Sequence, residues 1–111
     1  MRRLTEHDTW HALGEIPGPA LLCVTSASCG ACRALRAAAP GLSALAGEVT
    51  LLEVDAHDSP GIARELEVFH LPAMFLYLDG EYHRPLHSVL RPEAMAQAIR
   101  AALALPPEDP P

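Results

Sequence analysis

Cys29 and Cys32 are the residues of this sequence whose types and spacing are best suited to covalent chemistry. Their two intervening residues bring both sulfur atoms into bonding range when the segment forms the first turn of a helix. Cys29 would then lie at the helix N-terminus, where unpaired amides and the helix dipole favour a thiolate. The thiolate is the attacking species in disulfide exchange. The spacing therefore predicts a redox-active pair, with Cys29 as the nucleophile and Cys32 as the resolving thiol.

The same spacing has two other interpretations, half of a metal site or two chemically inert helix cysteines. A structural zinc site needs four ligands, and only Cys23 and scattered histidines could complete one here. His83 and His87 would share one face of a strand, but no cysteine or carboxylate stands at a matching position. We therefore expect no metal and no cofactor in this chain, and a zinc or iron–sulfur carrier is the least favoured class of function.

Length, composition and charge restrict the classes of fold and function that remain possible. A chain of 111 residues predicts one domain, and its 50% hydrophobic and 20% charged residues are typical of a globular protein. The net charge of −6 works against a nucleic acid or an anionic membrane surface as partner. No apolar stretch is long enough to cross a membrane, and Arg2 and Arg3 are not followed by a signal-type segment. We expect a cytoplasmic protein, in which three cysteines are not a disulfide scaffold.

Predicted helices and strands alternate along the chain, which favours parallel strands joined by helical crossovers. An Asp79–Gly80 turn adds an antiparallel hairpin at one edge. Pro40 and Gly41 are expected to kink or interrupt the second helix. Residues 1–105 should form the domain, and the Pro-rich tail 106–111 should be disordered. The expected helices are 10–14, 29–39, 60–68 and one beginning at Pro92, and the expected strands are 20–25, 49–54, 73–78 and 81–87.

Nearly the whole chain resembles the thioredoxin family. The segment Ser28–Cys32 occupies the place of the family's W-C-G-P-C, and Val54–Asp55 resembles the end of its central strand. The segment His70–Ala73 resembles its I-P-T strand start, and Asp79–Glu81 its N-G-E hairpin. The resemblance implies an α/β, thioredoxin-like fold with three α/β/α layers and a mixed four- or five-stranded sheet.

The resemblance also implies an activity, thiol–disulfide exchange with protein disulfides. The electrons would come from an external reductase, a flavoprotein in this family, and the protein would be a monomer. The Leu71–Pro72 bond would be cis and would lie beside the two cysteines. The residues that the resemblance places in the substrate groove are Gly30, Ala31, Leu71 and Pro72.

Four positions depart from the family pattern. Cys23 replaces the buried acid six residues before the first active-site cysteine, and Leu51 replaces the lysine usually paired with that acid. A buried thiol is a poor proton acceptor near neutral pH, so we expect slower turnover than in a standard thioredoxin. Ala31 and Ser28 replace the family's proline and tryptophan. The loss of the proline predicts a potential between about −270 mV, as in thioredoxin, and about −180 mV, as in the isomerases, and Ser28 predicts a weak fluorescence change on reduction.

Some residues keep two interpretations. Cys23 is either a small core residue or a third redox thiol that could trap Cys32. His70 is either an exposed loop residue or a cation that stabilises the Cys29 thiolate. Arg33 and Arg36 either lie on a solvated helix face, which is the default expectation, or interact with an acidic partner. For the whole chain, the alternative to an oxidoreductase is a thioredoxin-fold binding or assembly module whose thiols are vestigial or regulatory.

Overall fold

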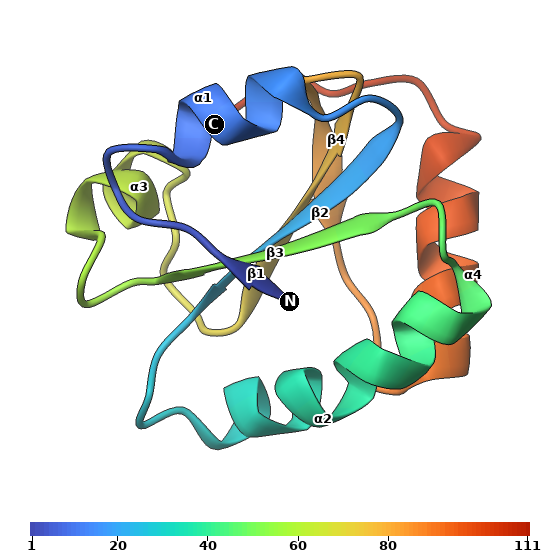
Figure 1. Cartoon of the computed structure of the whole chain (residues 1–111), viewed down its shortest axis with the longest axis horizontal. Helices are drawn as coiled ribbons and strands as arrows, with labels where there is room; N and C mark the ends of the chain where they lie inside the picture. Colours follow the sequence, from blue (N-terminus) through green and yellow to red (C-terminus); the bar gives the residue numbers. More distant parts are fainter.

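The computed structural model describes residues 1–111 as a five-stranded mixed sheet with four helices (Figure 1). The four predicted strands and four predicted helices are all present, with boundaries that differ by a few residues. The strands are β1 (Arg2–Arg3), β2 (Pro19–Thr25), β3 (Thr50–Asp55), β4 (Ala73–Leu78) and β5 (Glu81–Leu86). The helices are α1 (Thr9–Glu15), α2 (Gly30–Leu45), α3 (Pro60–Glu65) and α4 (Pro92–Leu103).

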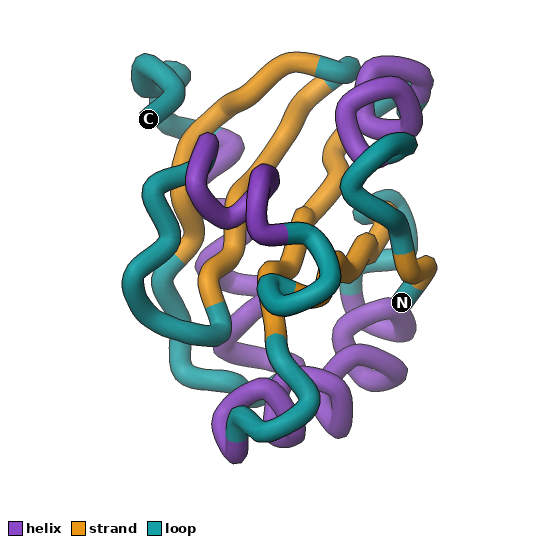
Figure 2. The backbone as a smooth tube through the Cα atoms, turned by 90° about the vertical axis from the view of Figure 1, so that its left-hand side faces the viewer, coloured by secondary structure: helices purple, strands orange, loops and turns teal.

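The sheet has the order β1-β3-β2-β4-β5 and lies between two helical layers. β2 pairs in parallel with β3 and antiparallel with β4, and the Asp79–Gly80 turn joins β4 to an antiparallel β5. α2 and α4 cover one face, and α1 and α3 cover the other (Figures 1 and 2). This is the three-layer α/β/α architecture with a mixed sheet that the sequence predicts.

Burial on both faces explains the continuous apolar pattern of the central strand β2. Successive side chains of a strand point to opposite faces. Leu21 and Cys23 therefore join the apolar cluster under α2 and α4, while Leu22 and Val24 join the cluster under α1 and α3. All four side chains are fully buried. A strand covered on both faces buries every side chain, so apolar residues stabilise it at every position.

One end of the sheet gathers the loops that carry the chemistry-bearing residues. Thr25, the last residue of β2, pairs with Asp55, the last residue of β3. Val24 pairs with Ala73, the first residue of β4. The loop that follows β2, the loop that follows β3 and the loop that precedes β4 must therefore lie at the same end of the sheet.

The structure excludes an interruption of the second helix at Pro40 and Gly41, because α2 runs through both residues, and a kink there stays a prediction. A proline inside a helix removes one hydrogen bond and costs about 3 kcal/mol. The buried side chains of Ala38, Ala39 and Leu42 lie on both sides of the proline and pack against the sheet. Their burial offsets the lost hydrogen bond, so the helix continues to Leu45.

Two further boundaries were not expected. β1 consists only of Arg2 and Arg3 and pairs in parallel with β3. Both residues are exposed and polar, so no apolar pattern predicts this edge strand. α3 ends at Glu65, and Glu67 then takes a positive φ of 53°, which breaks the helical path before Val68.

The C-terminal tail has no helix or strand, but it contacts the edge of the sheet. The amide of Glu108 donates to the carbonyl of His83 on β5 at 2.7 Å, and the Glu108 carboxylate lies 3.2 Å from Arg84. The disorder of residues 106–111 and the domain limit at residue 105 stay predictions. No helix of the structure has the length and hydropathy that a membrane span requires.

Candidate active site

Cys29 is the N-cap residue of α2, as the position of the pair after a buried strand predicts. Its backbone is extended, and its Sγ atom accepts a hydrogen bond of 3.1 Å from the amide of Cys32. Cap residues of this kind satisfy amides that have no partner within the helix. The three cysteines are free thiols, and Cys29 is the one that is partly exposed.

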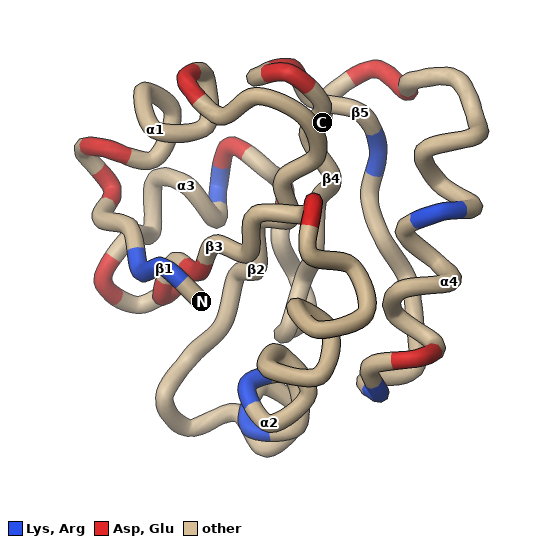
Figure 3. Tube along the Cα trace, turned by 45° about the vertical axis from the view of Figure 1, so that its right-hand side comes forward, with Lys and Arg blue, Asp and Glu red and all other residues tan.

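The surroundings of Cys29 favour its thiolate. The pKa of Cys29 is lowered first by a hydrogen bond from the Cys32 side chain, then by the amides of Cys32 and Ala31 and by the positive charge of Arg36. Partial desolvation acts in the opposite direction but does not prevail. The first half of α2 carries no acidic residue that would oppose this effect (Figure 3). Cys29 therefore has the features of an attacking thiol.

Cys32 has the opposite character. Its side chain is fully buried, and burial raises the pKa of the Cys32 thiol to about 11, with the hydrogen bond to Cys29 as the next cause. A thiol of this kind stays protonated at neutral pH. A partly exposed thiol with a lowered pKa beside a buried thiol with a raised pKa is the asymmetry that the predicted roles of nucleophile and resolving thiol require.

Cys23 and Leu51 are both buried in the apolar cluster beneath α2, at the two positions where the family pattern has a charge pair. Burial, with a smaller effect of the Glu53 charge, raises the pKa of the Cys23 thiol to about 12. Cys23 packs as a core residue, and a redox role for it stays a prediction.

The four residues predicted for a substrate groove lie on two of the gathered loops. Gly30 and Ala31 are exposed in the first turn of α2, and a side chain added at Gly30 would meet no atom within 4 Å. Leu71 and Pro72 are half-buried just before β4, and the bond between them is cis, as the family resemblance implies. Their role in substrate binding stays a prediction.

Two hollows flank this end of the sheet. One, of about 400 Å³, is mainly apolar and is lined by Pro72, His70 and Phe69, whose side chain is 85% exposed. The other, of about 440 Å³, is mainly polar and includes Ser28 and His57. His70 is exposed, and its effect on Cys29 stays a prediction.

A buried polar group was not predicted from the sequence. Arg36 Nε donates to the Glu53 carboxylate at 2.8 Å, and the Thr25 hydroxyl donates to the same oxygen at 2.7 Å. Arg36 is therefore ion-paired against the sheet, and the prediction of a solvated helix face is wrong for it. The available signal was Glu53 itself, a charged residue within the otherwise apolar strand 51–54, because an acid on a buried strand requires a partner.

His83 and His87, the histidines considered as metal ligands, do not share one environment. His83 is buried and lies 2.9 Å from the carbonyl of Ala102 near the end of α4, whereas His87 is exposed. The structure contains no group of three or more His, Cys, Asp or Glu side chains arranged to hold a metal ion.

Comparison with known families gives one match. The family model described as Thioredoxin matches residues 5–101 of the chain. The matched segment includes β2 to β5 and both cysteines of the C-x-x-C pair. No curated protein sequence matches the chain.

Solved structures share the fold at low sequence identity. The oxidised mitochondrial thioredoxin 3 of Saccharomyces cerevisiae superposes with a TM-score of 0.78 at 23% identity, covering 91% of this chain and 94% of that chain. The thioredoxin of Fasciola hepatica gives 0.74 at 22% identity, covering 94% and 97%. The zinc-bound form of human ERp44 gives 0.78 at 18% identity; the match covers 90% of this chain and 30% of ERp44.

Proposed function

The chain belongs to the thioredoxin family, and we propose that it is a thiol–disulfide oxidoreductase that exchanges the Cys29–Cys32 dithiol with disulfides of other proteins. The observation that carries the proposal is the hydrogen bond of 3.1 Å from the Cys32 amide to Cys29 Sγ at the start of α2. It supports a thiolate at the partly exposed sulfur, while the second sulfur is buried one turn away.

The reaction takes place in two exchange steps. The Cys29 thiolate attacks one sulfur of a substrate disulfide, forms a mixed disulfide and releases the first substrate thiolate. Cys32 then gives its proton to that thiolate, attacks Cys29 Sγ and releases the second substrate thiolate, which takes a proton from water. The dithiol loses two electrons to the substrate disulfide, and the product is a Cys29–Cys32 disulfide.

The exposed backbone beside Cys29 is the proposed binding site for the substrate. Gly30 and Ala31 leave one side of the sulfur open. Leu71 and Pro72 directly precede β4 at the same end of the sheet and would hold the substrate backbone in an extended form. The apolar hollow with Phe69 then accommodates a large side chain close to the attacked disulfide.

The cycle requires a partner that returns two electrons to the Cys29–Cys32 disulfide. We propose an external reductase, a flavoprotein as in the family, and a monomeric protein that acts in the cytoplasm without a bound cofactor. A net charge of −6 supports protein partners over nucleic acids or anionic membranes. In a reducing compartment the pair cycles between dithiol and disulfide, and Cys23 stays reduced.

Reduction of insulin by dithiothreitol tests the proposal. The chain should accelerate precipitation of the insulin B chain, and Cys29→Ser should remove the acceleration because the attacking sulfur is lost. Cys23→Ala is a matched control that keeps both active-site thiols, and its rate should remain close to that of the wild type. A wild-type rate equal to that of Cys29→Ser would exclude the oxidoreductase function.

A thioredoxin-fold binding or assembly module is the second candidate. The observation that favours it is the loss of the family's buried charge pair at Cys23 and Leu51. In this case the disulfide between Cys29 and Cys32 would regulate the binding of a partner protein. It would not take part in repeated cycles of thiol–disulfide exchange. Alkylation and mass mapping in defined thiol/disulfide buffers separates the two functions, because the enzyme requires a reversible pair at a cellular potential.

A further inference from the structure

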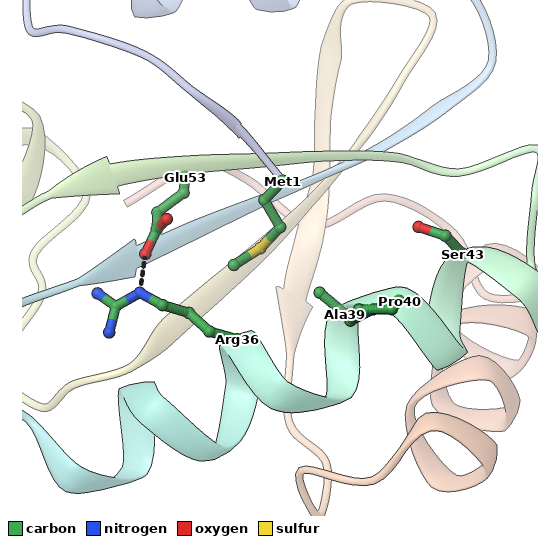
Figure 4. A pocket seen from close by; sticks show the side chains of 6 residues that line it. All are labelled: Met1, Arg36, Ala39, Pro40, Ser43 and Glu53. Atoms are coloured by element: carbon green, nitrogen blue, oxygen red, sulfur yellow. Dashed lines mark hydrogen bonds and ion pairs between the residues drawn. The ribbon is translucent and has the colours of Figure 1, made fainter.

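The ion pair of Arg36 and Glu53 joins α2 to the sheet, with a buried carboxylate and an arginine side chain that is 34% exposed. Glu53 is 6% exposed and Thr25 is fully buried. The carboxylate oxygen that accepts from Arg36 Nε at 2.8 Å also accepts from the Thr25 hydroxyl, and Arg36 Nη2 lies 3.1 Å from that hydroxyl. Figure 4 shows Arg36 reaching from α2 toward Glu53 on β3, beside a pocket of about 270 Å³. The Glu53 carboxylate on β3 and the Thr25 hydroxyl at the end of β2 thus hold one guanidinium group of α2.

The same Nη2 atom also contacts the loop that holds the thiols. Arg36 Nη2 lies 3.4 Å from the carbonyl of Ser26, and the amide of Cys29 donates to that carbonyl, also at 3.4 Å. Arg36 follows Cys32 by four residues, so the two lie on one face of α2. A single carbonyl oxygen therefore links the guanidinium group to the residue that carries the attacking sulfur.

We propose that Arg36 is the positioning residue for the active-site thiolates, and that Thr25 and Glu53 hold its guanidinium group in place beneath Cys29 and Cys32. This inference rests on the proposed oxidoreductase function and names a group that supports it. Arg36 compensates for the cation that this chain lacks at Leu51. It does so from α2 rather than from β3.

The orientation of the ion pair, with its positive end toward Cys29 and Cys32, agrees with this role. The charge of Arg36 lowers the pKa of Cys29 and opposes the rise in the pKa of Cys32, whereas the charge of Glu53 raises the pKa of Cys23. The positive end of the pair faces the reactive thiols and the negative end faces the core thiol. The other charged or titratable groups that line the polar hollow with Ser28 are Arg3, Asp55, His57 and Asp58.

The effect of Arg36 should be largest in the second exchange step. In the mixed disulfide, Cys29 has no charge, so its repulsion of a Cys32 thiolate disappears. The positive charge of Arg36 remains, and it stabilises the Cys32 thiolate that attacks Cys29 Sγ and displaces the substrate thiolate. The Cys32 proton has then passed to the first substrate thiolate, and no further reactant is needed.

A purely structural ion pair is the alternative, since buried pairs often contribute little net stability but are costly to break. The test is the pH profile of iodoacetamide alkylation of Cys29 in the fully reduced chain. Arg36→Met should raise the midpoint by about half a pH unit or more, which is about threefold less thiolate at neutral pH. Arg36→Lys should restore most of the reactivity. Arg33→Met removes an exposed arginine from the same helix and should leave the profile unchanged.

Two additional readouts separate an electrostatic role from a structural one. Removing the cation destabilises the reduced form, so the potential of the Cys29–Cys32 pair should become more negative in Arg36→Met. Thr25→Val, which keeps the side-chain shape but removes the hydroxyl, should shift the alkylation profile in the same direction by a smaller amount. If Arg36→Met does not fold, Arg36→Gln, which keeps a donor but has no charge, takes its place.

Coincident alkylation profiles and potentials for Arg36→Met (or Arg36→Gln), Arg33→Met and the wild type would overturn the inference. The measurement uses no protein substrate, so it is independent of insulin reduction. A chain that reduces no insulin but shows the Arg36-dependent profile would refute the proposed function alone. A chain that reduces insulin with no dependence on Arg36 would refute the inference alone.

Discussion

Cys23 and Glu53 lie opposite each other in the parallel ladder between β2 and β3. Both are buried on the face that α2 covers, so a thiol and a carboxylate share the site that the family pattern assigns to one acid. The carboxylate is neutralised by Arg36 at 2.8 Å and does not leave an unpaired charge in the core. The active site therefore has a charge pair next to Cys23 rather than at Cys23 and Leu51.

The first prediction concerns stability at alkaline pH. The folded chain holds the Cys23 proton until pH about 12 and the Cys32 proton until pH about 11, against an ordinary value of 9.0 for both thiols. Above pH 9 the unfolded chain therefore binds fewer protons than the folded chain, and the free energy of unfolding falls as pH rises. Each such proton steepens the fall by about 1.4 kcal/mol per pH unit.

Cys23→Ala tests this effect by removing one of the two protons. Urea denaturation at pH 7, 9, 10 and 11 should give a shallower fall for Cys23→Ala than for the wild type. Below pH 9 the two curves should be parallel, separated only by the cost of the smaller side chain. Equal slopes above pH 9 would contradict the assignment of a strongly raised Cys23 pKa.

The second prediction concerns the order in which the thiols react. In the reduced native chain at neutral pH, iodoacetamide should modify Cys29 first, because its pKa is lowered and its sulfur is partly exposed. Cys32 and Cys23 should react much more slowly, because both are buried and protonated. Mass mapping of timed samples gives the order, and denatured protein, in which the three rates should converge, is the control. A native chain in which Cys32 reacts before Cys29 would reverse the proposed roles.

The third prediction concerns the mixed disulfide. Cys32→Ser keeps the attacking sulfur but removes the sulfur that resolves the intermediate, so a disulfide between Cys29 and the substrate should accumulate. Non-reducing electrophoresis with a disulfide-containing protein should show a band of the combined mass that disappears on reduction. Cys29→Ser, in which only the buried Cys32 remains of the pair, should give little or none of this band.

The sequence is sufficient to predict the fold, because the apolar runs, the Pro60 helix start and the Asp79–Gly80 turn each have a local physical cause. The C-x-x-C pair has one as well, since its place between a buried strand and a helical segment puts Cys29 at a helix start. The ion pair of Arg36 could not be predicted from the local sequence. Its partners Thr25 and Glu53 are 11 and 17 residues away along the chain, and the pairing depends on the strand register. The continuation of α2 through Pro40 depends on tertiary burial in the same manner.

The fourth prediction uses Trp10, the single tryptophan, as a spectroscopic reporter. Trp10 lies on α1, at the opposite end of the molecule from the start of α2 (Figure 1). Its surroundings are Leu66, Tyr77 and the tail residues Pro110 and Pro111. Oxidation of the Cys29–Cys32 pair should therefore leave the tryptophan emission nearly unchanged. Emission spectra at defined thiol/disulfide ratios test this, and a large change would mean that the redox state reaches α1.

The last prediction concerns the residue between the two cysteines. The amide of Ala31 is one of the groups that lower the pKa of Cys29. Ala31→Pro removes that amide, and a proline is tolerated in the first turn of a helix. The Cys29 thiolate then loses one donor, the reduced form becomes less stable relative to the disulfide, and the potential should become more negative.

Equilibration with glutathione, followed by alkylation and mass analysis, measures the potential of Ala31→Pro against the wild type. Ala31→Ser is the matched control, because it changes the side chain but keeps the amide, and its potential should stay near the wild-type value. The two variants therefore separate the backbone donor from the side chain at this position. An Ala31→Pro potential equal to or above that of Ala31→Ser would show that the amide of residue 31 does not stabilise the thiolate. The lowered pKa of Cys29 would then depend on Cys32 and Arg36.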